Sequence, residues 1–301
     1  GVRSKAQRGN LLAQDLKIAP AQFASPLQLK QKDSTDCALK QIVNNVLQHF
    51  LPNATAIAAE QYNSEHVHQT RVAIRRLRSA LRVFSDWSTD ADPEWQEQLR
   101  TLFRQLGSTR DRDALSEGLL PQLQQAGAPF VQLPDAPEDN SIPIEESLRS
   151  LESVNLILAL LQFVHQPCAT KQKTQLEKDI AKKLQKLHQQ ICKDADHFLE
   201  LDIESQHRTR KRVKRLRYCI EFIASLYPGK ELKNYLKDLK PAQESLGQFN
   251  DLNVAEAMFQ DLVKRKQKVW FILGWIANEK KYILEQAQAH LDTYAKTDTF
   301  W

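Results

Sequence analysis

Glycine and long apolar runs are scarce in this chain of 301 residues, which holds only 8 glycines. Leucine, alanine, glutamine, lysine and glutamate are plentiful, and these residues favour helices. The longest apolar run, LILALLQFV at residues 156–164, is too short to cross a bilayer. No strand-like alternation bounded by hairpin turns stands out. We therefore expect an all-α protein without a transmembrane helix.

Cysteine and histidine residues at the spacing of a metal site are also missing from the chain. The four cysteines form no CxxC pair, and no Cys/His cluster has the spacing of a zinc site. We expect buried, reduced thiols in a cytoplasmic protein, and neither a metal nor a cofactor. The chain starts at Gly1 without a signal-peptide pattern, so we expect a piece of a longer protein. The cysteines are Cys37, Cys168, Cys192 and Cys219.

Acidic residues are absent from HVHQTRVAIRRLRSALRVF, residues 66–84, which carries five arginines and two histidines. The net charge of the whole chain is only +5, so positive charge is concentrated in this stretch. Like charges three or four residues apart cost a helix about 0.2–0.5 kcal/mol per pair. This repulsion must be offset either by acids on neighbouring helices or by an external polyanion.

An apolar period of 3.6 residues begins near residue 34 and continues to the end of the chain. Residues 1–33 look irregular, and residues 126–143 hold four prolines and a glycine, which indicates a loop. The predicted helices cover about 34–51, 60–87, 93–107, 111–125, 144–165, 171–201, 205–227, 230–246, 249–267 and 269–296.

The sequence repeats itself at an offset near 140 residues. HQTRVAIRRLRSALRVF (68–84) aligns without a gap with HRTRKRVKRLRYCIEFI (207–223), and LGSTRDRDAL (106–115) aligns with LGQFNDLNVA (246–255). The repeat is too long, and its copies are too few, for a solenoid. Two matches in the same order at the same offset predict two related helical bundles in tandem. We expect them to join near residues 165–170 and to be related by a pseudo-twofold axis.

On a helical wheel, each copy of the first motif shows a core stripe with a basic ladder beside it. The core stripes are Ile74, Leu77, Leu81 and Phe84 in the first copy, and Val213, Leu216, Ile220 and Ile223 in the second. The ladders are His68, Arg71, Arg75, Arg78 and Arg82, and then His207, Arg210, Lys214 and Arg217. The second ladder is shorter, because Glu221 stands where a last basic residue would be. A pseudo-twofold axis would bring the ladders face to face and make a basic groove.

Arginine presents a fork of donors that matches phosphate oxygens, and histidine adds a donor whose charge rises below about pH 6.5. A row of such groups suits an extended chain of phosphates. Asp111 and Asp251 hold matched positions near the start of a helix. Each could cap the helix, orient a neighbouring arginine or have a catalytic role. Further basic residues near the second motif pair are Arg100, Arg104, Arg110 and Lys240.

The patterns HxxRVxxRRLRxxLRxF, LRxLxRxLGxxRDxD, HRxRxxxKRLRYxxEF and LKxxQxxLGxxND occur in this order and together resemble the CHAD family of helical domains with characteristic histidines. The resemblance covers residues 34–301 and places the two bundles at about 34–165 and 166–301. It implies two pseudosymmetric antiparallel bundles of about four helices each around a basic central pore or groove. It also implies non-catalytic binding of inorganic polyphosphate, in the cytoplasm or at polyphosphate granules. One departure, Ala242 in place of a leucine, concerns packing.

The resemblance also implies which residues bind the ligand. Position by position, these are His68, Arg71, Arg75, Arg76 and Arg78, and then His207, Arg210, Lys214, Arg215 and Arg217. Arg76 and Arg215 lie off the ladders on the wheel. We extend the predicted site to Arg82, Arg100, Arg104, Arg110 and Lys240. The opening SKAQRGNLLA resembles the end of a CYTH domain, so residues 1–33 would be its remnant and linker, and its catalytic carboxylates and metal site would lie upstream.

Two other functions compete with polyphosphate binding. One is a phosphohydrolase that acts on polyphosphate or triphosphate, or an accessory domain of such an enzyme. Phosphoryl transfer uses metal-binding carboxylates beside the basic groups, and neither ladder has them. The other is nucleic-acid binding, which uses aromatic residues between the arginines. Trp87 and Tyr218 lie nearest, and both fit packing. We expect a non-enzymatic binder that is not attached to a membrane, with a CYTH domain as its covalent partner.

Overall fold

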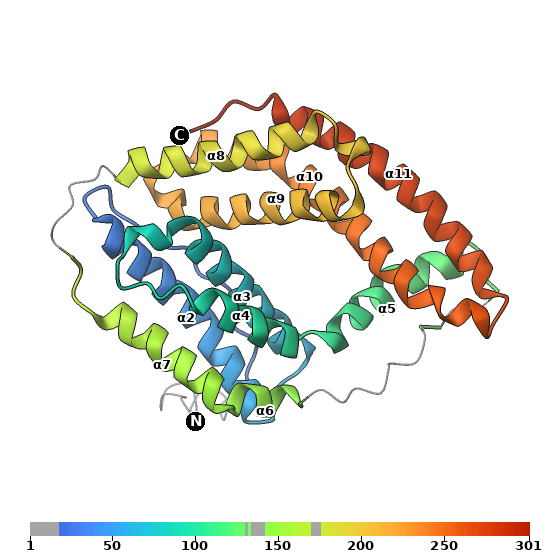
Figure 1. Cartoon of the computed structure of the whole chain (residues 1–301), viewed down its shortest axis with the longest axis horizontal. Coiled ribbons are helices and arrows are strands. Elements are labelled where there is room, and N and C mark those ends of the chain that lie inside the picture. The colour runs from blue at the N-terminus through green and yellow to red at the C-terminus, as the bar shows by residue number, and fades with distance from the viewer. Residues whose placement is uncertain (1–17, 130–131, 134–141, 170–175) are drawn as a thin grey trace. The chain divides into compact units, whose positions relative to one another are not determined.

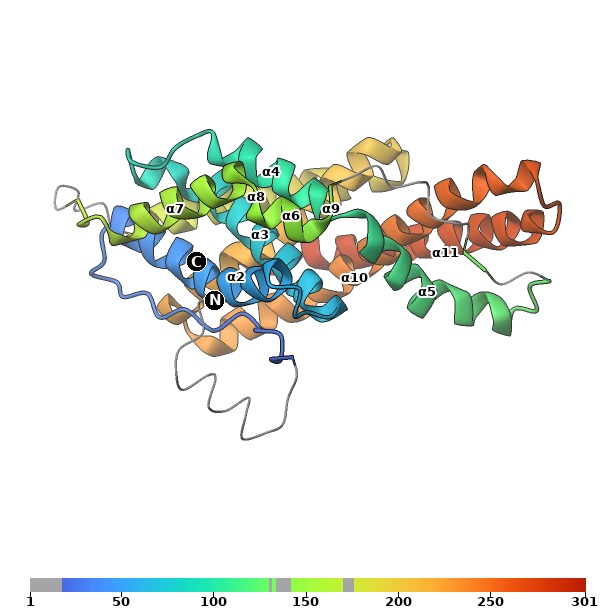
Figure 2. The same cartoon turned by 90° about the horizontal axis from the view of Figure 1, so that it is seen from below.

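The structure is a computed structural model that describes residues 18–129, 132–133, 142–169 and 176–301, without the side chains of residues 108–114, 117 and 264. Every regular element in these residues is helical, which confirms the all-α prediction. None of the helices within these ranges is long and apolar enough to span a membrane. The α-helices, labelled in Figures 1 and 2, are α2 (Thr35–Ala58), α3 (Ser64–Phe84), α4 (Trp95–Gln105), α5 (Ser108–Gln125), α6 (Ile144–Arg149), α7 (Leu151–His165), α8 (Leu176–Ala195), α9 (Ile203–Ile223), α10 (Gly229–Gln260) and α11 (Val269–Ala295).

Two predicted helix ends are wrong. Helix α2 was expected to stop before Pro52, and it continues through this proline to Ala58. Proline removes a backbone donor, but the side-chain amide of Asn53 donates to the carbonyl of His49 at 2.7 Å, within the affected turn. The continuing turns also bury Ala54 and Ile57, so packing offsets the cost of the proline.

Helix α10 likewise runs unbroken through Gly247, where two helices were expected. The matching residue of the first repeat, Gly107, does separate two helices, α4 and α5. The same leucine–glycine motif therefore ends a helix in one copy and lies inside a helix in the other.

The chain divides into two compact units. Unit 1 consists of Gly1–Arg110, Asn140–Ile180 and Tyr218–Leu226, and unit 2 consists of Asp111–Asp139, Ala181–Arg217 and Tyr227–Trp301. Most of α5 thus belongs to unit 2 although its sequence belongs to the first repeat, and the end of α9 belongs to unit 1. The pseudo-twofold axis and the pore stay predictions.

Unit 1 is built around α2 and α3, which lie side by side, with α4, α6 and α7 packed against them (Figure 1). The stripe predicted for α3 is confirmed, because Ile74, Leu77, Leu81 and Phe84 are each at most 3% exposed. Helix α3 begins with a capping box, in which Asn63 and His66 satisfy each other's backbone groups. The cap uses His66, which is buried, so the ladder begins two residues later with His68.

In unit 2, α10 and α11 lie side by side along much of their length (Figure 1). Helix α5 packs Leu119 and Leu123 against this pair, where they meet Phe259 and Ile272 in one apolar cluster. A second core group surrounds His188, whose Nδ1 atom lies 3.0 Å from the hydroxyl of Tyr235 and 2.9 Å from that of Tyr294. The second predicted stripe, which runs along α9 from unit 2 into its last residues in unit 1, is also confirmed, since its members are fully buried: Val213, Leu216, Ile220 and Ile223.

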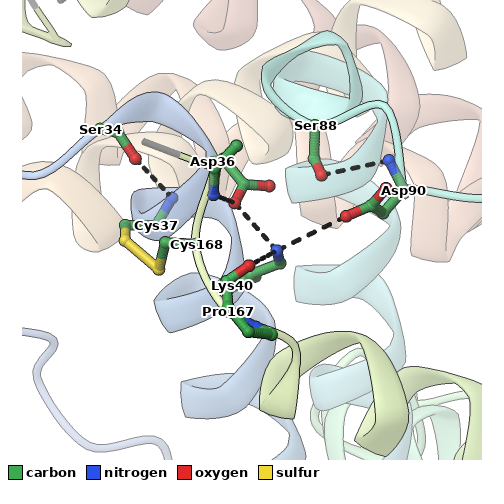
Figure 3. A network of polar contacts seen from close by, with 9 residues as sticks. Ser34, Asp36, Cys37, Lys40, Ser88, Asp90, Pro167 and Cys168 are labelled. Carbon is green, nitrogen blue, oxygen red and sulfur yellow. Dashed lines mark hydrogen bonds and ion pairs between the residues drawn. A yellow bond between two sulfur atoms is a disulfide. The ribbon is translucent and has the colours of Figure 1, made fainter. Parts of the chain in front are cut away.

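The prediction of four reduced cysteines is wrong for two of them. Cys37, in the first turn of α2, and Cys168, after α7, form a disulfide with Cα atoms 5.2 Å apart (Figure 3). They are 131 residues apart, and pairing at such a distance cannot be deduced from sequence spacing. Cys192 and Cys219 are free thiols. The disulfide removes the support that reduced cysteines gave to a cytoplasmic location.

Polar contacts tie the same two segments together beside the disulfide (Figure 3). The buried ammonium group of Lys40 lies 2.9 Å from the carboxylate of Asp36 and donates to the carbonyl of Pro167 at 3.0 Å. The backbone N–H of Ala169 also donates to Asp36. Burial acts to raise the pKa of Asp36, but hydrogen bonds from Ser88, Lys40 and Ala169 outweigh it and hold this pKa below its usual value.

Residues 18–34, the described part of the segment before α2, contain no helix, and side-chain hydrogen bonds fix them to unit 1. Asn53 accepts from the N–H of Gln22 at 2.9 Å and donates to its carbonyl at 2.8 Å. The hydroxyl of Ser225 exchanges hydrogen bonds with the backbone of Leu29 in the same way, and the Leu29 side chain is only 4% exposed. The opening SKAQRGNLLA lies outside the described residues.

Candidate functional site

Arg71 is the most enclosed member of the first ladder, at 5% exposure. Its Nη1 atom donates to the carbonyl of Leu106 at 2.8 Å, and its guanidinium lies 4.5 Å from the ring centre of Phe103. Leu106 caps the C-terminal end of α4, where backbone carbonyls lack helical partners. Arg71 therefore joins α3 to the end of α4.

Gly107 leaves room for this contact. An added Cβ would lie 2.8 Å from the carbonyl oxygen of Arg104 and 3.0 Å from Nη1 of Arg71. The glycine of the first leucine–glycine motif is therefore explained by the close approach of an arginine to the backbone.

We expect Gly107→Ala to lower the free energy of unfolding by about 1–2 kcal/mol, because the new methyl group meets backbone that must shift. Gly247 provides the control, because it lies inside α10 and an added Cβ there has no neighbouring atom within 4 Å. We expect Gly247→Ala to raise the free energy of unfolding by about 0.5–1 kcal/mol. Urea unfolding of the two variants checks both signs, and destabilisation by Gly247→Ala would contradict this account.

Arg76 lies off the ladder, as the wheel predicts. It is 4% exposed, and its Nε atom lies 3.9 Å from a carboxylate oxygen of Glu221. Its guanidinium also lies 4.8 Å from the ring centre of Phe222 and 3.4 Å from the amide oxygen of Asn45. For Arg76, the carboxylate of Glu221 and the ring of Phe222 offset the charge inside unit 1, which is the internal alternative considered for this stretch.

The other arginines of α3 meet those of α4 and form what we call the α3–α4 arginine cluster. Burial lowers the pKa of Arg78, and the nearby charges of Arg100, Arg82 and Arg104 lower it further. Such a shift means that these guanidinium groups are close enough to repel one another. The cluster consists of Arg78, Arg82, Arg100 and Arg104, together with Arg75, whose guanidinium lies 5.8 Å from the ring centre of Phe103 on α4.

Little negative charge balances this cluster. Within the described residues its one ion pair joins Arg100 to Glu97 at 3.1 Å, and both side chains are exposed. The buried Nε atoms of Arg75 and Arg78 have no hydrogen-bond partner within the same residues. Exposed ion pairs contribute at most about 1 kcal/mol, so Glu97 leaves most of the repulsion in place. The cluster is therefore suited to an external anion.

The second ladder follows α9 in unit 2. Its members Arg210, Lys214 and Arg217 are partly exposed. His207 lies 2.9 Å through Nδ1 from the amide oxygen of Asn250 on α10, so Nδ1 carries the hydrogen. Burial lowers the pKa of His207, and the charges of Lys211 and Arg210 add to this effect, so the imidazole is mainly neutral near pH 7.

A groove between α9 and α10 opens beside this histidine. Its volume is about 530 Å³. Gln206, His207 and Arg210 line it on α9, and Leu246, Phe249, Asn250 and Asn253 line it on α10. The second leucine–glycine motif thus supplies one wall, and its Asn250 holds the histidine of the other.

The remaining predicted site residues differ in setting. Lys240 is exposed on α10 and lies 3.7 Å from Glu244, and Arg215 is partly buried on α9. The side chain of Arg110 lies outside the described residues, as does that of Asp111. In the part of the chain that the structure describes, no group of three or more His, Cys, Asp or Glu residues is arranged to hold a metal ion.

Sequence reasoning missed three functional neighbours. Phe103 supports two guanidinium groups, with its ring centre 4.5 Å from Arg71 and 5.8 Å from Arg75. Asn250 orients His207, and its position four residues after Leu246 could have indicated a shared helix face. Asp194 on α8 binds Arg212 at 2.6 Å, so part of the charge of α9 is neutralised inside unit 2.

Three comparisons place the chain among known proteins. The crystal structure of the CHAD domain from the plant Ricinus communis has 28% sequence identity to it and a TM-score of 0.71, covering 91% of this chain and 96% of that one. PptA from Streptomyces chartreusis gives a TM-score of 0.64 over 90% of this chain and 99% of its own, and at 15% identity the likeness is one of fold alone. A search of curated protein sequences gave no match. The CHAD domain family model matches residues 41–260, and the chain therefore belongs to the CHAD-domain family.

Proposed function

We propose that this protein binds inorganic polyphosphate without hydrolysing it. The observation that carries the proposal is the α3–α4 arginine cluster, in which guanidinium groups crowd Arg78 and Glu97 is the one carboxylate of the described residues that forms an ion pair with them. A phosphate chain brings one or more negative charges per unit and can contact several arginines at once. Bidentate hydrogen bonds between arginine and phosphate are among the stronger ones in proteins.

The contacts divide the predicted ligand residues into two groups. Arg71 and Arg76 are buried and bound to other parts of unit 1, so we assign them to positioning α3. We assign ligand contact to the arginine cluster and His68 in unit 1, and to His207, Arg210, Lys214 and Arg217 in unit 2. Binding without catalysis is favoured because Glu97, the carboxylate paired with the cluster among the described residues, is exposed and already bound to Arg100.

We expect the affinity to grow with polyphosphate chain length and to fall steeply with salt. The four cluster arginines that lack an ion-pair partner among the described residues contribute a slope of roughly −3 to log K against log salt concentration, because each contact releases counterions, and contacts with the basic residues of unit 2 would make the slope steeper. Isothermal titration with polyphosphates of several lengths at several salt concentrations measures both trends. Affinity that is independent of length and salt would contradict the proposal. Release of phosphate with Mg²⁺ or Mn²⁺ would favour an enzyme, and displacement of polyphosphate by equal amounts of RNA would favour a nucleic-acid binder.

A further inference from the structure

Aromatic side chains gather on the outer side of α11, which polyphosphate binding does not use. Trp270 is 64% exposed and Tyr282 is 57% exposed, and Phe271 is exposed as well. At about 100° per residue these three side chains lie within about 120° of one another around the helix, over about 18 Å of its length. The opposite side packs against α10 and α5, and Ile272 and Ile276 are fully buried there (Figure 1). The three aromatic residues therefore form one solvent-facing surface, which we call the α11 aromatic face.

The polar atoms of this face are directed to solvent. Neither the indole N–H of Trp270 nor the hydroxyl of Tyr282 forms a hydrogen bond with another described residue. By contrast, the indole of Trp301 donates to Gln185 at 3.0 Å. Exposed tryptophan and tyrosine favour surroundings that are apolar on one side and wet on the other. The boundary between lipid headgroups and acyl chains provides such surroundings.

The charge around the aromatic face is positive. No acidic residue occurs from Leu262 to Asn278, a stretch that contains four basic residues. Arg265 and Lys268 are exposed just before α11, and Lys281 is exposed on the face itself. The exposed acid Glu285 lies beyond the aromatic residues, toward the C-terminal end of the helix. A membrane surface with anionic lipids attracts exposed lysine and arginine side chains, so the charge of this region complements it.

The shape of the face favours a lipid surface over a nucleic acid. Single-stranded nucleic acids also use aromatic and basic residues, but they bind along a groove that follows their backbone. The groove of unit 2 lies between α9 and α10, and no residue of α11 lines it. Gly274 and Ala277 are small exposed residues between Phe271 and Tyr282, so the face is even and convex rather than hollowed. An amphipathic helix with such a face can lie flat on a membrane.

We propose that the α11 aromatic face binds a membrane surface that contains anionic lipids. The three aromatic rings would lie at the level of the headgroups, and the basic residues Arg265, Lys268 and Lys281 would face the lipid phosphates. Such a contact needs no spanning helix, and none occurs within the described ranges. It would revise the expectation, drawn from the sequence, of a protein that is not attached to a membrane. It does not rest on polyphosphate binding, because the face shares no residue with the α3–α4 arginine cluster.

Sedimentation of the whole chain with lipid vesicles tests this inference. We use vesicles of phosphatidylcholine alone and vesicles in which one third of the lipid is phosphatidylserine. We expect the vesicles with phosphatidylserine to bind on the order of tenfold more tightly, because each exposed basic residue adds to the attraction. This preference should decrease at high salt, which screens the charges.

Two variants of Trp270 separate the apolar contact from the indole signal. Trp270→Ser is expected to weaken binding to the phosphatidylserine vesicles about tenfold, because a large apolar side chain is lost. Trp270→Phe keeps an apolar ring, so binding should stay within about threefold, while the blue shift of tryptophan fluorescence on adding vesicles should largely disappear. Leu151→Ser is the matched control, since Leu151 is an exposed apolar residue on α7, and it should leave vesicle binding unchanged. All three changes are at exposed positions, so the melting temperature should stay the same.

Three outcomes would overturn the inference. The first is equal binding to the two kinds of vesicle, and the second is vesicle binding that survives Trp270→Ser. The third is binding of single-stranded RNA that is lost in Trp270→Ser while vesicles do not bind, which would make the face a stacking surface for bases. Polyphosphate binding should be unchanged in Trp270→Ser, so failure of this inference and failure of the proposed function can be told apart.

Discussion

Polyphosphate binding is expected to weaken on the order of 100-fold when Arg78 and Arg104 are both changed to glutamate. Hydrogen bonds to charged groups contribute about 1.5–3 kcal/mol each, so losing two such contacts already accounts for this factor. The new carboxylates would also repel phosphate. The residues are suitable targets because Arg78 is in the centre of the crowding and Arg104 is exposed beside it. Isothermal titration at fixed salt measures the loss.

Stability separates a binding role from a structural one. Because the two substitutions remove repulsion around Arg78, we expect the melting temperature of the variant to be unchanged or higher. Lys30→Glu with Lys32→Glu is the matched control, since it changes the net charge equally at exposed positions outside the cluster. An equal loss of affinity in the control would mean that bulk charge decides binding. A loss below threefold in the cluster variant would exclude the cluster as the ligand site.

Removing the disulfide is expected to have the largest effect on stability. We expect Cys37→Ser with Cys168→Ser to lower the free energy of unfolding by about 2–4 kcal/mol, because the cross-link restricts a long loop of the unfolded chain. The bond spans 131 residues, which places the effect toward the upper end of this range. The contacts of Lys40 and Asp36 with Pro167 and Ala169 hold the same segments in the folded state and remain in the variant. The loss therefore arises mainly in the unfolded chain.

Urea unfolding of the oxidised chain, the reduced chain and the serine variant measures this contribution. We expect the reduced chain and the serine variant to have the same free energy of unfolding, and we expect the reducing agent to leave that of the variant unchanged. Cys219→Ser serves as the control, because it removes a buried thiol that forms no disulfide, and its effect should not depend on redox conditions. Four titratable thiols in the denatured oxidised chain would contradict the cross-link.

Periodicity predicted most of the fold because helix faces are a local property. The stripes around Leu77 and Leu216 could be recognised from apolar spacing alone, and both are buried. The helix ends predicted at Pro52 and Gly247 were wrong. Proline and glycine have a low intrinsic helix propensity, but packing against neighbouring helices can stabilise a helix that continues through them. The disulfide could not be predicted, since it depends on how distant segments meet.

The candidate site was predicted in outline but not in its internal division of roles. The helical wheel separated Arg76 from the ladder because the spacing of residues in the sequence fixes the side of the helix on which each side chain lies. It could not show that Arg71 turns to the carbonyl of Leu106, or that Asn250 orients His207, because both contacts join different helices. The crowding around Arg78 likewise depends on the packing of α3 against α4.

The described residues before α2, 18–34, are held against the helices of unit 1. Its hydrogen bonds with Asn53 and Ser225 imitate the pairing of a β-strand, although its partners are side chains on helices. A chain trimmed to start at Thr35 would expose the apolar surface under Leu29 and leave these polar groups to water. Residues from about 19 onward therefore act as a covering strip of unit 1, and a protein shortened to the helical region alone would be more prone to aggregate.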